Sequence, residues 1–174
     1  MSRVFLSVGS NIAPAEHLRD GVSDLGHMIC IRAVSTVVQT VPIGPRAQPV
    51  YYNAVLEVST ELPPRTLKYE ILRPLEERQG RTRCADKYAP RPLDLDILLY
   101  GDLVCADDDL VLPDPEISAR AFLAHLLCEL APELVLPGTD RTISSIARTL
   151  PATGMTPLVH YTRELRILIA GLSA

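Results

Sequence analysis

The sequence predicts an α+β fold, a ferredoxin-like sandwich in which one mainly antiparallel sheet carries helices on one face. Strand-like alternation and helical spacing follow one another in the order β-α-β-β-α-β, which is the order of two split βαβ units. Turn residues separate the segments, and the length of 174 residues suits one domain. We therefore predict a single domain over residues 1–174, with 138–174 as its C-terminal extension.

Composition limits the functions that the chain can have. Apolar residues make up 47% of the sequence, yet no apolar run approaches the ~18 residues that a membrane span requires. The formal charge of −4 argues against generic nucleic-acid binding, which usually needs a basic surface. The cysteines form no C-x-x-C pair, so we expect free thiols in a reducing compartment. These features predict a cytoplasmic monomer that binds small molecules and neither nucleic acid nor membrane.

The first half of the chain is expected to form a strand, a helix and two further strands. Residues 3–9 alternate apolar and other side chains, and Pro14 then begins a helix that a later glycine can end. Residues 29–40 are rich in β-branched side chains, which favour strands. Residues 51–60 alternate again, after a loop punctuated by proline and glycine.

The second half is expected to add helices and one more long strand. Pro63 and Pro64 precede a helical stripe of leucine and isoleucine. Pro74 lies late in this helix and should kink it near Glu70, because proline removes a backbone donor. The remaining expected elements are one strand and two helices: 93–100, 119–130 and 142–150.

Two carboxylates two residues apart provide the sharpest chemical signal. Asp94 and Asp96 lie in the predicted strand 93–100, so both side chains point to one face, with Cα atoms ~6.6 Å apart. Such a pair suits a hard cation, because Mg²⁺ usually takes one or two carboxylates plus substrate phosphates. A solvated strand face without metal is the alternative.

A basic segment leads into this strand. Residues 80–91 carry Arg81, Arg83, Lys87 and Arg91 without regular periodicity. Guanidinium groups donate paired hydrogen bonds to phosphate oxygens, so the segment and the acidic pair together suit a polyphosphate bridged to metal. Taken alone, the segment could be a charged surface loop. The absence of G-x-x-x-x-G-K-[ST] and G-x-G-x-x-G excludes a Walker-type or Rossmann site.

A weaker set of residues could recognise a flat heterocycle. Tyr51 and Asn53 share one strand face, where a ring can stack and an amide can pair with donors and acceptors. Phe122 lies near the start of a predicted helix, and Glu76, late in the helix before it, is a candidate polar anchor of the same cleft. Ordinary core and surface positions are the alternative for each of them.

Several motifs together resemble the 6-hydroxymethyl-7,8-dihydropterin pyrophosphokinase family of folate biosynthesis, over about residues 4–137. The resemblance begins with L-S-V-G-S-N at 6–11 and continues through Q-P-V-Y-Y-N-A at 48–54. It is most specific in P-R-P-L-D-L-D-I at 90–97, and R-A-F at 120–122 is similar to the start of a family helix.

The resemblance implies transfer of a diphosphate from ATP to the hydroxymethyl group of the reduced pterin, giving AMP, with two Mg²⁺ ions held by Asp94 and Asp96. The implied catalytic residues are Arg81, Arg91, Asp94 and Asp96. The implied ATP-binding residues are Arg81, Arg83, Tyr88, Arg91, Asp114 and Arg120. The implied pterin-binding residues are Thr40, Pro42, Ile43, Tyr51, Asn53 and Phe122, with Glu76 as a polar residue of the cleft.

One position departs from the family pattern in a way that bears on activity. Asp114, between two prolines, occupies the place of a family histidine that faces the nucleotide phosphates. A carboxylate there opposes a polyanion unless it binds metal or turns away. Two alternatives therefore stay open: a non-catalytic or weakly active pterin- or nucleotide-binding relative, and another Mg²⁺-dependent phosphotransferase on the same fold.

Overall fold

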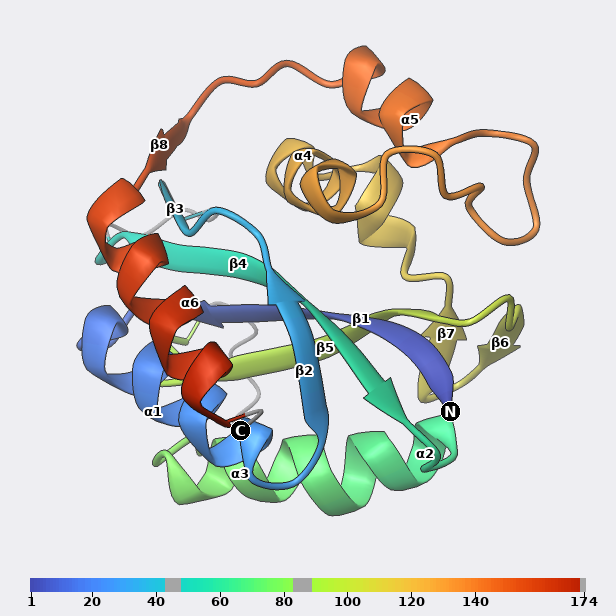
Figure 1. The fold of residues 1–174 in the computed structure, drawn as a ribbon. Helices are drawn as coiled ribbons and strands as arrows, with labels where there is room; N and C mark the ends of the chain where they lie inside the picture. Colours follow the sequence, from blue (N-terminus) through green and yellow to red (C-terminus); the bar gives the residue numbers. More distant parts are fainter. Residues whose placement is uncertain (43–47, 83–88, 173–174) are drawn as a thin grey trace.

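The structure is a computed structural model that describes residues 1–42, 48–82 and 89–172 (Figure 1). All strand pairings of the main sheet in these ranges are antiparallel, in the order β5-β1-β4-β3-β8, with β2 also paired to β4. These strands are β1 (Ser2–Ser10), β2 (Cys30–Val34), β3 (Val38–Thr40), β4 (Tyr51–Thr60), β5 (Asp94–Tyr100) and β8 (Met155–Pro157). The predicted α+β class with a mainly antiparallel sheet is confirmed.

Helices and a small hairpin complete the described part. The helices are α1 (Pro14–Gly26), α2 (Pro64–Thr66), the π-helix η1 (Leu67–Leu72), α3 (Arg73–Arg78), the 3-10 helix η2 (Pro115–Ser118), α4 (Ala121–Leu130), α5 (Ile143–Thr149) and α6 (Val159–Leu172). The hairpin consists of β6 (Cys105–Asp107) and β7 (Leu110–Leu112). No helix in the described ranges combines the length and the apolar character needed to cross a membrane.

The helices cover both faces of the sheet, whereas the sequence had predicted one covered face. In Figure 1, α1, α3 and α6 lie on one side of the sheet and α4 and α5 on the other. Alternate residues of β1 belong to two separate cores: Val4 and Leu6 pack in the core under α1, and Phe5 packs in the core with α4. Because strand side chains alternate between faces, a strand that is apolar at successive positions needs a cover on each side.

The predicted strand 29–40 is divided into β2 and β3. The division occurs at Ser35, whose backbone N–H donates to Val55 O and whose hydroxyl accepts from Val55 N–H, both at 2.9 Å. The hydroxyl takes the place of a backbone acceptor. The chain therefore stays beside β4, although the regular backbone hydrogen bonds between the two strands are interrupted. Val37, the next residue but one, turns its backbone groups away from β4 toward the C-terminal segment.

Pro74 changes the helical type before it. Arg73 N–H donates to Lys68 O, five residues earlier, at the end of the π-helix η1. Proline has no N–H and its ring crowds the carbonyl four residues before it, so the wider π turn accommodates Pro74. The helix therefore continues through α3 to Arg78 and brings Glu76 toward β5.

Candidate active site

A cavity of about 440 Å³ lies where one end of the sheet meets η2 and the start of α4. Many of the residues predicted from the sequence line it, and they come from strands and helices far apart in the chain. These residues are Thr40, Pro42, Tyr51, Asn53, Arg91, Asp94, Asp96, Asp114, Arg120 and Phe122. Ile43, Arg83 and Tyr88 lie outside the described residues.

The two carboxylates of β5 are directed into this cavity. Asp94 and Asp96 lie opposite Gly9 and Ser7 of β1, while Leu95 and Ile97 between and beyond them are each only 5% exposed. Asp96 is open to solvent through the cavity, but protein surrounds it on the other sides. Partial loss of hydration, followed by repulsion from Asp94 and then Asp114, raises the pKa of Asp96 to about 6. The cavity therefore concentrates negative charge that a cation would relieve.

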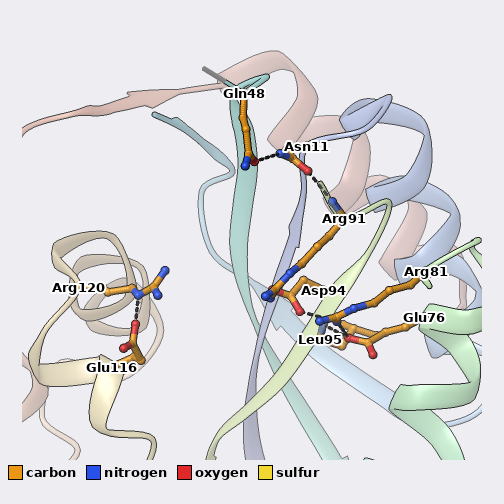
Figure 2. Close-up of polar contacts among 9 residues, drawn as sticks. All are labelled: Asn11, Gln48, Glu76, Arg81, Arg91, Asp94, Leu95, Glu116 and Arg120. Atoms are coloured by element: carbon orange, nitrogen blue, oxygen red, sulfur yellow. Dashed lines mark hydrogen bonds and ion pairs between the residues drawn. The ribbon is translucent and has the colours of Figure 1, made fainter. Parts of the chain in front are cut away.

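Two arginines already neutralise Asp94. Arg81 Nη1 lies 2.5 Å from Asp94 Oδ1, and Arg91 Nη1 lies 2.5 Å from Asp94 Oδ2. Figure 2 shows the two guanidinium groups converging on this carboxylate. Arg81 does not line the cavity, whereas Arg91 does. The arginines thus lie next to the acidic pair, where they can redistribute their hydrogen bonds when another anion enters.

Glu76 supports the acidic strand from behind and does not line the cavity. Its carboxylate is 2% exposed, accepts a hydrogen bond from Leu95 N–H at 2.9 Å and forms an ion pair with Arg81. The pairing of Arg81 with both Glu76 and Asp94 compensates the buried charge. The sequence placed Glu76 in the cleft, but it could not distinguish the lining of a cleft from the layer behind it.

Asn11 holds the chain at Arg91, a role that sequence reasoning missed. Asn11 Oδ1 accepts from Arg91 N–H at 2.7 Å, and Asn11 N–H donates to Arg91 O at 3.1 Å. Its amide also donates to Gln48 Oε1 at 3.2 Å, and Gln48 lines the cavity (Figure 2). The signal was present, since Asn11 ends the motif at 6–11, but no role followed from its type alone.

Another part of the cavity lining, the aromatic wall, combines aromatic rings and an oriented amide. Asn53 is 8% exposed and donates from Nδ2 to Thr40 Oγ1 at 2.8 Å. Tyr51 is half-buried, and burial raises the pKa of its hydroxyl. Phe122, on α4, lines the cavity as well. Because Thr40 takes one amide proton, the remaining donor and acceptor of Asn53 have a defined direction.

Asp114 caps η2 and lies beside two cavities. Its Oδ1 accepts from Glu116 N–H at 2.8 Å, which orients the carboxylate. Burial raises the pKa of Asp114 to about 6, and Arg120 and Lys68 oppose this rise. Figure 2 shows Arg120 paired with Glu116, away from Asp94, so this arginine does not neutralise the acidic pair.

A second cavity of about 240 Å³ shares Asp96 and Asp114 with the first. Lys68 lies on one side of it, and the turn of the β6–β7 hairpin with Leu110 and Val111 lies on another. Lys68 Nζ donates to Asp109 O, which ties the hairpin to η1. The sequence contained no periodicity or motif that pointed to this cavity, because it forms only when the hairpin folds against η1.

The donor set at the acidic pair fits a substrate-bound divalent cation. Asp94 and Asp96 offer hard oxygen ligands on one strand face, and Mg²⁺ commonly takes two such carboxylates together with phosphate oxygens. In the described ranges, no group of three or more His, Cys, Asp or Glu side chains could hold a metal without other ligands. The two carboxylates thus offer part of a coordination shell that phosphate oxygens could complete.

Comparison with known proteins provides the family. Residues 5–132 match the family described as 7,8-dihydro-6-hydroxymethylpterin-pyrophosphokinase (HPPK). The 2-amino-4-hydroxy-6-hydroxymethyldihydropteridine pyrophosphokinase of Haemophilus influenzae is 36% identical over 80% of this chain and 88% of its own. The enzyme of the same name from Pseudomonas aeruginosa is 35% identical over 89% of this chain and 96% of its own.

A solved structure shares the fold. The crystal structure of Plasmodium falciparum HPPK-DHPS, a triple mutant with SDX-DHP, superposes with a TM-score of 0.68 at 13% identity. It matches 85% of this chain, which spans 44% of that longer protein. Because the family model matches most of the chain and both bacterial relatives carry the same name, the chain belongs to the 7,8-dihydro-6-hydroxymethylpterin-pyrophosphokinase family.

Proposed function

We propose that the two cavities hold the two substrates of a pyrophosphokinase and that the transferred phosphates lie between them. The chain transfers a diphosphate from ATP to the hydroxymethyl group of 6-hydroxymethyl-7,8-dihydropterin, a step of folate biosynthesis, as its named relatives do. The observation that carries the placement is that Asp96 and Asp114 line both cavities. A phosphate chain at this junction would be within reach of both substrates.

Asp94 and Asp96 are the residues we assign to Mg²⁺, two ions in total. When bound, the metal neutralises phosphate charge and polarises the oxygens at the transferred group. The carboxylates are directed into the cavity from one strand, with Leu95 buried between them. The neighbouring Glu76 holds the Leu95 amide, so both carboxylates stay on the cavity face.

We assign the triphosphate to the arginines at the edge of the acidic pair. Arg91 and Arg120 line the larger cavity, and Arg81 lies behind Asp94. Arg81 and Arg91 converge on Asp94, and each guanidinium presents its N–H donors in a planar fork that matches phosphate oxygens. An incoming phosphate would take over some of the hydrogen bonds that these arginines make to carboxylates. Arg83 and Tyr88 keep their proposed roles in ATP binding.

We assign the larger cavity's aromatic wall to the pterin. Tyr51 and Phe122 provide ring faces, and Asn53 provides an amide whose orientation Thr40 determines. Pro42 lies beside them, and Ile43 keeps its proposed role there. This arrangement would direct the hydroxymethyl group toward Asp96, where the phosphates are proposed to lie.

The reaction needs the hydroxymethyl oxygen to attack the β-phosphorus of ATP, with AMP as the leaving group. The described lining of the larger cavity offers several carboxylates as acceptors for the hydroxyl proton. Asp114 is among them, and its cap on η2 directs it toward the shared edge of the two cavities. A non-catalytic relative or another phosphotransferase is not favoured, because the named relatives are pyrophosphokinases.

The wider setting follows from the same assignment. We propose a cytoplasmic monomer of one domain over residues 1–174, acting on small molecules and on neither nucleic acid nor membrane. The segment from 138 onward packs on the main sheet through β8 and α6, which supports the single-domain proposal.

A direct assay tests the proposed function. The protein is mixed with ATP, Mg²⁺ and the reduced pterin, and AMP is quantified by chromatography, with omission of the pterin as a control. AMP that appears only in the complete mixture would support the proposal. ADP formation, or AMP formation without pterin, would contradict it.

A further inference from the structure

We infer that the C-terminal segment formed by β8 and α6 positions the pterin wall of the larger cavity, with Thr162 as its main positioning residue. The inference rests on the proposed assignment of this wall to the pterin. The family match ends at residue 132, so the segment lies outside it.

The first observation is the place of β3 in the sheet. β3 has only three residues, and its last residue, Thr40, receives the Asn53 amide hydrogen bond. β4 pairs with one edge of β3 and β8 with the other, where Thr40 lies opposite Met155. Without β8, the strand that carries Thr40 would be a short free edge.

The second observation is a buried pair of hydrogen bonds at Val37. Val37 N–H donates to Thr162 Oγ1 at 2.8 Å, and Val37 O accepts from Leu158 N–H at 2.8 Å. Val37 is fully buried and Thr162 is 4% exposed, so water cannot replace the hydroxyl. The Thr162 hydroxyl in turn donates to Leu158 O at 2.9 Å. Val37 directly precedes β3, and the first turn of α6 therefore determines where β3 begins.

The third observation is a contact next to Tyr51. Tyr161 donates its hydroxyl hydrogen to Ala15 O at 2.6 Å, and its ring meets the ring of Tyr52 edge-on, with centroids 5.8 Å apart. Tyr52 follows Tyr51 on β4 and points to the opposite face of the sheet. The segment thus supports both strands of the pterin wall, β3 through Thr162 and β4 through Tyr161.

The consequence is specific to one substrate. Loss of the Thr162 hydroxyl would leave Val37 N–H buried without an acceptor, and β3 would shift to satisfy it. The Thr40 hydroxyl would move with β3 and turn the Asn53 amide. The second cavity, on the other side of Asp96, contains no residue of β3, β4, β8 or α6 in its described lining.

Three variants of the 174-residue chain test the inference. Thr162→Val removes the hydroxyl at constant shape, and Thr162→Ser restores it. The matched control is Thr60→Val, because Thr60 is also 4% exposed and its hydroxyl accepts Leu62 N–H, but it lies at the far end of β4. The measurements are Tm, kcat, and KM for the pterin and for ATP in the AMP assay.

We expect both valine variants to lower Tm, and Thr162→Val alone to raise KM for the pterin about five- to tenfold, roughly the effect of one lost hydrogen bond. KM for ATP should stay within about twofold, and Thr162→Ser should resemble the wild type. A Thr162→Val variant with unchanged KM for the pterin, or with equal increases for both substrates, would overturn the inference. An inactive wild type would instead contradict the proposed function.

Discussion

The buried carboxylate of Glu76 accepts a hydrogen bond from the backbone N–H of Leu95, the residue that separates Asp94 from Asp96. The helix that carries Glu76 thereby holds β5 at the point where its two carboxylates enter the cavity. Arg81 forms ion pairs with both Glu76 and Asp94, so the buried Glu76 carboxylate is linked to β5 through this arginine as well. The energetic consequences of this arrangement can be measured.

Glu76→Ala should lower the free energy of unfolding by about 3 kcal/mol, because it leaves a buried N–H without an acceptor and breaks a buried ion pair. Glu76→Gln keeps the acceptor and should cost less. The control is Glu57→Ala, which breaks the more exposed pair with Arg3 and should cost less than about 1 kcal/mol. Urea unfolding measures all three. Equal costs at both sites would show that Glu76 does not support β5.

Asp94→Asn and Asp96→Asn should both reduce turnover by about three decades or more, because metal stabilisation of a transferring phosphoryl group contributes several kcal/mol. The control, Asp102→Asn, removes an exposed carboxylate outside the described lining of both cavities and should leave turnover unchanged. Near-normal turnover in either cavity variant would refute its proposed role at the metal.

The same two variants should differ in stability when no metal is added. Asp94→Asn weakens pairs with Arg81 and Arg91 and should destabilise the protein. Asp96→Asn should stabilise it slightly at pH 7, since folding raises the pKa of Asp96 from 3.8 to about 6. Ionised Asp96 therefore disfavours the folded state, and this effect develops as the pH rises from about 4 to 6. Thermal unfolding at pH 4 and pH 7 shows whether Asp96→Asn raises Tm at the higher pH. A rise in Tm that occurs only at pH 4 would contradict the prediction.

Asp114→Asn should tighten binding of a non-hydrolysable ATP analogue with Mg²⁺ by about two- to fivefold, because a partly screened negative charge is removed beside the phosphates. The amide oxygen can still accept Glu116 N–H, so η2 should keep its cap. Calorimetry gives the affinity, with Asp102→Asn as a control of equal charge change. Weaker binding by Asp114→Asn alone would mean that Asp114 helps to hold the cation.

Gly9→Ala should raise KM for the pterin by about tenfold, since a Cβ at this position would lie 2.7 Å from Asn53 Oδ1. The amide cannot easily retreat, because its Nδ2 already donates to Thr40. Gly171→Ala is the control: a Cβ there meets nothing within 4 Å, so kinetic parameters should not change. An unchanged KM for the pterin in Gly9→Ala would argue against Asn53 as a recognition residue.

Much of the scaffold could be predicted from the sequence, because burial of one face of a strand or helix makes apolar residues recur at a regular spacing. Alternation located β1, β4 and β5, and the same alternation implied that Asp94 and Asp96 share a face. The break between β2 and β3 could not be predicted, because it depends on the Ser35 hydroxyl meeting Val55 across the sheet. The second covered face was missed for a similar reason: a β-α-β-β-α-β order does not state on which side later helices pack.

The sequence predicted many of the residue types in the candidate site. It could not distinguish residues that line the cavity from residues that support them. Tyr51 and Asn53, two apart on one strand, share a face as the spacing predicted, and both line the cavity, although their pattern alone was equally compatible with ordinary core and surface positions. The support provided by Glu76, Asn11 and Thr162 depends on contacts between segments far apart in the chain, which no local spacing encodes. Residues that act behind a site need a structure to be recognised.

The most direct test of the account is the fate of one oxygen atom. ATP labelled with ¹⁸O in the bridge between the α- and β-phosphorus is incubated with the protein, Mg²⁺ and the reduced pterin, and the products are analysed by mass spectrometry. Attack of the hydroxymethyl oxygen on the β-phosphorus breaks its bond to the bridge, so the label should be found in AMP. Formation of ADP, or recovery of the label in released pyrophosphate, would contradict diphosphate transfer at this site.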